Sequence, residues 1–198
     1  MIVKDTGNGN FEQAPAGTHL GRCIKLVDIG TQKGEYQGQA TFKRQIIIGW
    51  ELPSELMQNG EYAGQPFTVS KFYTASLSEK ANLRKDLENW RGRAFTDEEL
   101  RGFDMKNILG KPCMLSIVLN EKNNARVGGV MAAPKGMSLP ETSSQVTYFS
   151  LEEGEFDMAT FESFSEKMRQ MISQSPEFHE RMKQTGKSSD AFEDDIPF

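Results

Sequence analysis

Residues 40–52, ATFKRQIIIGWEL, carry the strongest strand signal in this chain of 198 residues. The stretch combines β-branched and aromatic residues with partial alternation of polar and apolar positions, as in a strand with one buried face. Gly49 indicates a β-bulge. We expect the ring of Trp50 to lie in the core, because tryptophan is highly buried on average. The stretch therefore predicts a central strand of a β-sheet.

The flanking sequence continues the strand pattern on both sides of this stretch. Residues 17–29 precede it, and a glycine-rich hairpin loop separates the two. Residues 66–74, PFTVSKFYT, predict a third strand. Residues 111–120 and 125–132 predict a fourth and a fifth strand around a tight turn, and the glycine pair VGGV in the last one indicates a bend of the strand.

The period changes from strand to helix between the third and fourth predicted strands. Residues 78–93 place apolar side chains at helical spacing, with Ser78 as the expected N-cap. Thr96 is expected to cap a second, shorter helical segment. Three strands, a helix and two strands are the element order of the OB-fold, a partly open barrel that binds oligonucleotides or oligosaccharides. We therefore predict a mainly β protein built on a five-stranded OB-fold barrel.

The charge distribution divides the chain into a body and an acidic end. Residues 1–135, the predicted OB domain, hold 18 Lys and Arg against 15 Asp and Glu, whereas residues 136–198 hold 5 against 13. Residues 136–185 read as a linker and a helical appendage, in which 158–172 have the pattern of one amphipathic helix broken before Pro176. Residues 186–198 read as a flexible acidic tail.

Composition and motifs exclude several classes of protein. No apolar run is long enough for a transmembrane helix, and the first residues lack the apolar region of a signal peptide, so we expect no membrane association and a cytoplasmic location. Cys23 and Cys113 stand outside any metal or redox motif and are expected to be buried thiols. Without a nucleophile, base, metal or cofactor motif, no enzymatic activity, metal or cofactor is expected.

A protein that binds single-stranded nucleic acid without reading its sequence needs cations that contact the phosphates and aromatic rings that stack on the bases. The predicted second and third strands and their neighbouring loops supply both. Alternation places Phe42 and Arg44 on one face, and Lys71 and Tyr73 on one face with Phe72 opposite, so that only part of each cluster meets a ligand. The candidate single-stranded DNA-binding residues are Lys33, Tyr36, Phe42, Arg44, Lys71, Phe72, Tyr73, Lys122 and Arg126.

The last six residues, EDDIPF, place two large apolar side chains behind three carboxylates. The ending resembles the C-terminal tip of bacterial single-stranded DNA-binding proteins, whose core is an OB-fold. In that family the tip docks into a hydrophobic pocket with a basic rim on replication and repair proteins. The resemblance implies that Phe198 and Pro197 anchor the tip, that Ile196 adds a lesser contact, and that Asp194 and Asp195 meet the basic rim.

A second resemblance lies in the body, where YTASLSEKANLRKDLENWRGR (residues 73–93) is similar to single-stranded DNA-binding proteins of tailed bacteriophages. It implies a protein that works in the bacterial host cytoplasm and recruits host replication or repair proteins. The bacterial proteins have a shorter core and a longer tail rich in Gly, Gln and Pro. Their tetrameric state is therefore not implied here, and a homo-oligomer stays one of the possibilities.

These observations predict a protein that coats and protects single-stranded DNA during phage replication or recombination. Two alternatives stay open at this point: a recombination mediator that anneals strands or also binds duplex DNA, and a structural interaction protein on an OB scaffold without DNA affinity. The opposite charges of body and tail further suggest that the tail lies partly on the DNA-binding groove until DNA displaces it.

Overall fold

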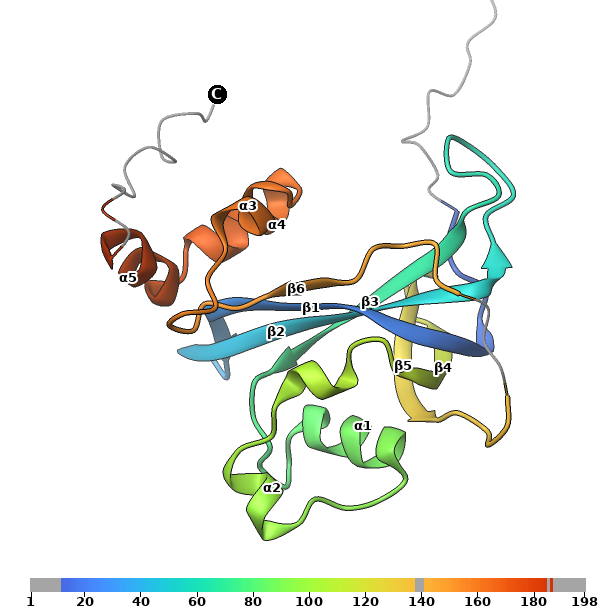
Figure 1. Cartoon of the computed structure of the whole chain (residues 1–198), viewed down its shortest axis with the longest axis horizontal. Helices are drawn as coiled ribbons and strands as arrows, with labels where there is room; N and C mark the ends of the chain where they lie inside the picture. The colour runs from blue at the N-terminus through green and yellow to red at the C-terminus, as the bar shows by residue number, and fades with distance from the viewer. Residues whose placement is uncertain (1–11, 138–140, 185, 187–198) are drawn as a thin grey trace, which may run out of the picture.

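The computed structural model describes residues 12–137, 141–184 and 186 and is built around one twisted, mainly antiparallel sheet (Figure 1). The hydrogen-bonded order is β3-β2-β1-β4-β5, and the short β6 pairs in parallel with β1 where β1 leaves β4. The six strands are β1 (Gly17–Tyr36), β2 (Gln39–Leu56), β3 (Pro66–Thr74), β4 (Pro112–Leu119), β5 (Ala125–Ala132) and β6 (Thr147–Phe149).

The five predicted strands are present in a mainly antiparallel sheet, as expected for a mainly β protein, and hydrogen bonds do not close this sheet into a barrel. The described chain adds a sixth strand, and β3 and β5 stand at opposite ends of the hydrogen-bonded order. Helix α1 (Asn82–Arg91) contacts both of these end strands. β3 and β5 also contact each other directly, so packing between these two strands and α1, rather than a backbone ladder, joins the two ends of the sheet.

The glycine-rich stretch predicted as a hairpin loop is mostly strand. β1 and β2 stay in register out to the pair Tyr36 and Gln39, and only Gln37 and Gly38 form the turn. Both turn residues have positive φ (52° and 76°), the combination that suits the twist of a two-residue hairpin. The hairpin therefore projects as a long two-stranded extension of the sheet.

Two bulges in β1 change the face to which its side chains point. The register with β2 skips Ile24 and again Ile29, so each isoleucine is an extra residue on β1. The bulge expected at Gly49 therefore lies on the opposite strand, at Ile24, next to the Lys25 with which Gly49 pairs. Glycine allows a close approach at this pair, because a Cβ on Gly49 would lie 3.0 Å from the Cβ of Lys25. The bend expected in VGGV is confirmed, because the β4–β5 register skips Gly128.

The first core fills the space between one face of the sheet and α1. Trp50 is fully buried as predicted, and its ring lies 6.1 Å from that of Trp90 on α1. Cys23 and Cys113 are buried free thiols, also as predicted, and burial raises the pKa of Cys23 to about 12. The same core takes apolar side chains from β1 to β5 and from α1.

The helices between β3 and β4 follow the predicted order with different starts. Thr96 caps α2 (Asp97–Arg101) in a full capping box with Glu99, as its position predicted. The expected cap at Ser78 is wrong, because α1 begins at Asn82 and its N-cap residue, Ala81, has no side-chain hydrogen bond. After α2, extended backbone at Gly102 ends the helix, and the 3-10 helix η1 (Met105–Ile108) follows.

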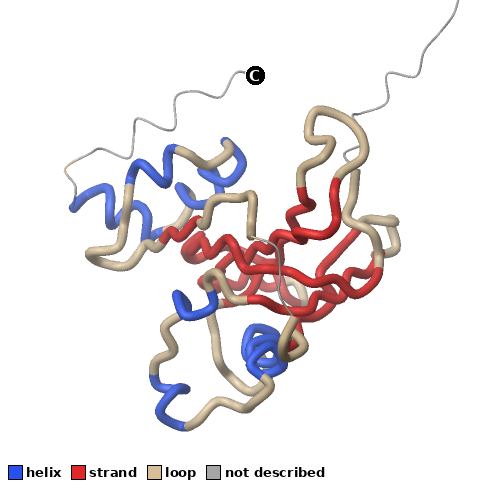
Figure 2. Tube along the Cα trace, turned by 45° about the vertical axis from the view of Figure 1, so that its right-hand side comes forward, coloured by secondary structure: helices blue, strands red, loops and turns tan. Residues whose placement is uncertain are grey.

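Three C-terminal helices cover the opposite face of the sheet (Figures 1 and 2). The single helix predicted at 158–172 is wrong, because the chain breaks after α3 (Met158–Glu162) and resumes as α4 (Glu166–Ser173). The break before Pro176 is confirmed, where α5 (Pro176–Gln184) begins. The predicted apolar face is kept in the second core, which comprises Val27, Ile29, Ile47, Phe149, Leu151, Phe161, Ile172, Phe178 and Met182, with Phe164, Met168 and Met171 packed against it.

The two cores share strands β1 and β2, so the C-terminal helices and the sheet support one another.

None of the helices that the structure describes is long and apolar enough to cross a membrane.

This shared sheet makes a prediction for stability. Replacing Ile172, which is fully buried on α4, by Ala should lower the free energy of unfolding by about 3 kcal/mol, the usual cost of removing a buried isoleucine. Urea unfolding followed by far-UV circular dichroism should show one cooperative transition at lower urea. The control Val146→Ala, at a half-exposed position, should shift it by less than about 0.5 kcal/mol. A separate early transition in the Ile172 variant would show that the helices unfold independently of the sheet.

Candidate nucleic-acid interface

The extension of β1 and β2 beyond the second bulge is the most exposed regular element of the sheet. Residues 31–44, here called the ribbon, pair only with each other among the described strands. Because the ribbon has two strands and no other part of the described chain packs over its outer half, side chains on both of its faces reach solvent, and residues 33–40 are all exposed.

Each face of the ribbon carries one aromatic ring and one lysine. Phe42 pairs in register with Lys33, so their side chains share a face. Tyr36 lies on the other face, where strand alternation also places Lys43. The rings are about two-thirds exposed, 66% for Tyr36 and 67% for Phe42. Strand alternation alone predicts that Lys43 points to the face opposite Phe42 and Arg44 and therefore excludes it from the binding surface, and the open ribbon removes that restriction.

Arg44, by contrast, is bound within the protein at the base of the ribbon. Its guanidinium donates to both carboxylate oxygens of Asp28, with Nε at 3.3 and 3.2 Å, and lies 3.8 Å from a carboxylate oxygen of Glu152. The hydrogen bonds to Asp28 raise the pKa of Arg44 above its ordinary value. Arg44 shares the face of Phe42, as predicted, but its charge is partly neutralised.

Lys71 and Tyr73 share a face, as predicted, but it is the inner face of the sheet against α1. The ammonium of Lys71 and the hydroxyl of Tyr73 both donate to Oδ2 of Asp86 on α1, at 2.8 and 2.7 Å. Burial and the Asp86 carboxylate raise the pKa of Tyr73 well above its usual range. Phe72 points the other way and is half exposed. Of the three residues on β3, only Phe72 presents its side chain to solvent.

The remaining predicted residues lie on a different hairpin. Lys122 is in the β4–β5 turn and Arg126 is near the start of β5, and both are exposed. The pairing of Gly17 with Ile117 places this hairpin at the beginning of β1, whereas the ribbon turn is at its end. The nine predicted residues therefore do not form one patch.

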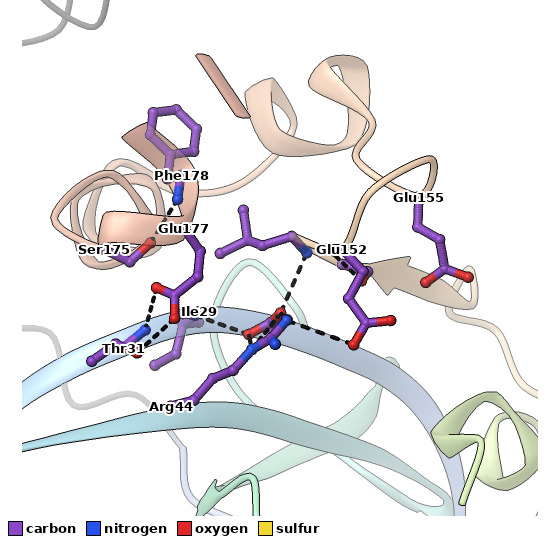
Figure 3. Close-up of polar contacts among 12 residues, drawn as sticks. Ile29, Thr31, Arg44, Glu152, Glu155, Ser175, Glu177 and Phe178 are labelled. Atoms are coloured by element: carbon purple, nitrogen blue, oxygen red, sulfur yellow. Dashed lines mark hydrogen bonds and ion pairs between the residues drawn. The ribbon is translucent and has the colours of Figure 1, made fainter. Parts of the chain in front are cut away.

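A polar network fixes the base of the ribbon to the C-terminal segment (Figure 3). Asp28 accepts hydrogen bonds from the backbone N–H groups of Gly30 (2.9 Å) and Leu151 (3.3 Å). Glu177 on α5 accepts from the backbone N–H of Thr31 (2.9 Å) and from its hydroxyl (2.6 Å). Together, these contacts hold the first residues of the ribbon against the sheet and α5.

Gly30 is required between these two carboxylates for two reasons. Its φ of 70° lies in the left-handed region, and a Cβ at this position would collide with the side chain of Ser175. Sequence reasoning missed the whole network. The only signal for Asp28 is a charged residue at the end of an apolar strand, and nothing local indicates that Glu177 pairs 146 positions away.

The predicted docking residues Asp194, Asp195, Ile196, Pro197 and Phe198 lie outside the described residues. Within the part of the chain that is described, no group of three or more His, Cys, Asp or Glu side chains is placed to hold a metal ion. A scan against protein-family models gives no match, and a search of curated proteins gives none. With no matching family or curated protein, the exposed rings and lysines of the ribbon are the structural feature that bears most directly on function.

The Thr31–Glu177 contact makes a prediction about acid stability. Burial pushes the pKa of Glu177 upward, but the hydrogen bonds from the hydroxyl and the N–H of Thr31 outweigh it and lower the pKa below its ordinary 4.5. A carboxylate with a lowered folded-state pKa stabilises the protein above pH 4.5, and this contribution is lost as the pH falls through the folded-state pKa.

Thr31→Val removes the hydroxyl donor and should raise the pKa of Glu177, measured by NMR titration of its side-chain carboxyl carbon. The difference in stability between pH 7 and pH 3 should shrink accordingly. Thr41→Val, on the ribbon but without a contact to Glu177, is the matched control. An unchanged pKa in the Thr31 variant would show that the hydroxyl contact does not act on Glu177.

Proposed function

We propose that this protein binds single-stranded DNA without sequence specificity and that the ribbon is its principal contact surface. The observation that carries the proposal is that each face of the ribbon has one exposed ring and one lysine: Phe42 opposite Lys33 on one face, and Tyr36 and Lys43 on the other. A ring that stacks on a base contributes about 1–3 kcal/mol for any base, because every base has a π-face. The neighbouring ammonium groups neutralise phosphates and release counterions.

The strand order supports the proposal that the sheet is an opened OB-type fold. In an OB-fold, the oligonucleotide runs across strands 2 and 3 between the β1–β2 and β4–β5 loops. The half-exposed ring of Phe72 lies on the sheet face that Tyr36 and Lys43 share, whereas Lys122 and Arg126 lie at the other end of β1 and are not part of the proposed surface. In this proposal, Arg44, Lys71 and Tyr73 support the surface through Asp28 and Asp86 and do not bind phosphate themselves.

The resemblance of residues 73–93 and of the C-terminal tip to single-stranded DNA-binding proteins supports the biological setting. We propose a non-enzymatic protein that coats and protects single strands during phage DNA replication or recombination in the bacterial cytoplasm. Its tip, residues 194–198, docks onto host replication or repair proteins through the apolar side chains of Ile196, Pro197 and Phe198.

Fluorescence anisotropy of a labelled oligo-dT tests the ribbon directly. Tyr36→Ala and Phe42→Ala should each weaken binding about tenfold through the loss of one stack. Lys33→Gln and Lys43→Gln should each reduce the dependence of affinity on salt by close to one unit of slope. Tyr62→Ala, which removes an exposed ring from the β2–β3 loop, is the matched control and should leave affinity unchanged. Equal affinities for Tyr36→Ala, Phe42→Ala and Tyr62→Ala would rule out the ribbon as the binding surface.

The acidic tail is tested by truncation after Gly186. If residues 187–198 compete with DNA for cationic groups of the body, the truncated protein should bind oligo-dT more tightly than the full chain at low salt. The two affinities should converge as salt screens the competition. Affinity that is no tighter after truncation would show that the tail does not occupy the DNA-binding surface. In that case the tail would act on protein partners alone.

A further inference from the structure

A cavity of about 620 Å³ opens where the ribbon joins the sheet. Its volume lies within the range of about 300–1,000 Å³ that is usual for small-molecule sites. It lies between β1 and β2 at the base of the ribbon and the segment after β3 on one side, and the loop before η1 and the end of β6 on the other. Its floor is apolar and its walls carry aromatic rings: the lining includes Leu26, Ile46, Leu83, Phe103, Tyr148 and Phe149.

The cavity continues one face of the ribbon. Along β2, alternation places Phe42, Arg44 and Ile46 on the same side. The ring of Phe42 is exposed on the ribbon, Arg44 lines the cavity, and Ile46 forms part of its floor. At roughly 3.3 Å per residue, Phe42 and Ile46 are about 13 Å apart along the strand. A single strand with one base stacked on Phe42 can therefore bring another of its bases, further along the strand, to the mouth of the cavity.

The charges around the cavity select against phosphate and in favour of N–H donors. Asp28 is paired with Arg44, and Glu155 is paired with Lys106 and the hydroxyl of Tyr148. Glu152 has a side chain 66% exposed, and among the described residues its carboxylate has only the ion pair with Arg44 at 3.8 Å, so it keeps acceptor capacity toward a ligand. Asp104 uses one oxygen to cap η1, and the other accepts no hydrogen bond from the described residues.

We propose that this cavity receives one unstacked base of the bound single strand and favours bases that carry an exocyclic amino group over thymine. The inference rests on the proposed binding of single strands by the ribbon. A flat, neutral ring suits the aromatic walls, and an amino group donates to the free carboxylate oxygens as cytosine N4 does to Asp or Glu. Phosphates stay outside, near Lys33. Inserting a base costs little here, because a single strand has no base pair to break.

The test compares oligo-dC with oligo-dT of equal length by fluorescence anisotropy, at a slightly alkaline pH where oligo-dC stays unfolded. The full-length protein should bind oligo-dC about fivefold more tightly, the effect of one net hydrogen bond. The double variant Glu152→Ala with Asp104→Asn should bring the ratio of the two affinities close to one without weakening oligo-dT binding. Asparagine keeps the oxygen that caps η1. The control Glu153→Ala removes a neighbouring exposed carboxylate that does not line the cavity.

The outcomes separate the two proposals. Equal binding of oligo-dC and oligo-dT by the full-length protein would overturn base insertion and leave single-strand binding in place. A double variant that binds both oligonucleotides more tightly by the same factor would also overturn it, since the carboxylates would then act only by repelling phosphate. Failure to bind either oligonucleotide would overturn the proposed function, and base insertion would fall with it. Loss of the oligo-dC preference with oligo-dT binding retained, and no loss in Glu153→Ala, would support the inference.

Discussion

The arrangement of the sheet, the ribbon and the C-terminal helices depends on the hydrogen bonds and the ion pair of one buried carboxylate, that of Asp28. A carboxylate removed from water costs several kcal/mol unless it is paired and hydrogen-bonded. Asp28 meets this requirement with three partners from different parts of the chain: the N–H of Gly30 just after it, the guanidinium of Arg44 on β2 and the N–H of Leu151 after β6. Satisfying this one charge fixes where the ribbon leaves the sheet.

The bulges in β1 extend this constraint to both cores. An extra residue in a strand reverses the faces of all side chains that follow, relative to an uninterrupted strand. With Ile24 and Ile29 inserted, β1 gives Leu26 to the first core and Val27 and Ile29 to the second. One strand thus supports α1 on one side and α3 to α5 on the other, and its last residues still form the ribbon.

Local sequence was sufficient for those parts of the fold that local physics determines. β-Branched and aromatic runs marked all five long strands, Thr96 marked a helix start, and the apolar face of 158–172 was correct although the helix is broken. The length of β1 was underestimated because Gly30 and Gly34 resemble loop residues in isolation. β3 and β5 contact each other without forming a ladder, an outcome of the tertiary packing about which strand patterns contain no information.

The candidate site was only partly predictable for a related reason. Residue type and alternation placed Phe42 with Arg44 and Phe72 apart from Lys71 and Tyr73, but they do not show which charges find internal partners. Asp86 on α1 takes both Lys71 and Tyr73, and Asp28 takes Arg44, in contacts set by the tertiary fold. The DNA surface proposed from the structure is therefore smaller and more concentrated on the ribbon than the nine residues suggested.

The placement of the two tryptophans has a spectroscopic consequence. Trp50 and Trp90, the chain's whole complement of indole rings, lie together in the first core, whereas the second core is built around phenylalanines. Intrinsic tryptophan emission therefore reports on the packing of α1 against the sheet. A loosening of the C-terminal helices that leaves the first core intact is silent in that signal, so the emission of this protein describes only one of its two halves.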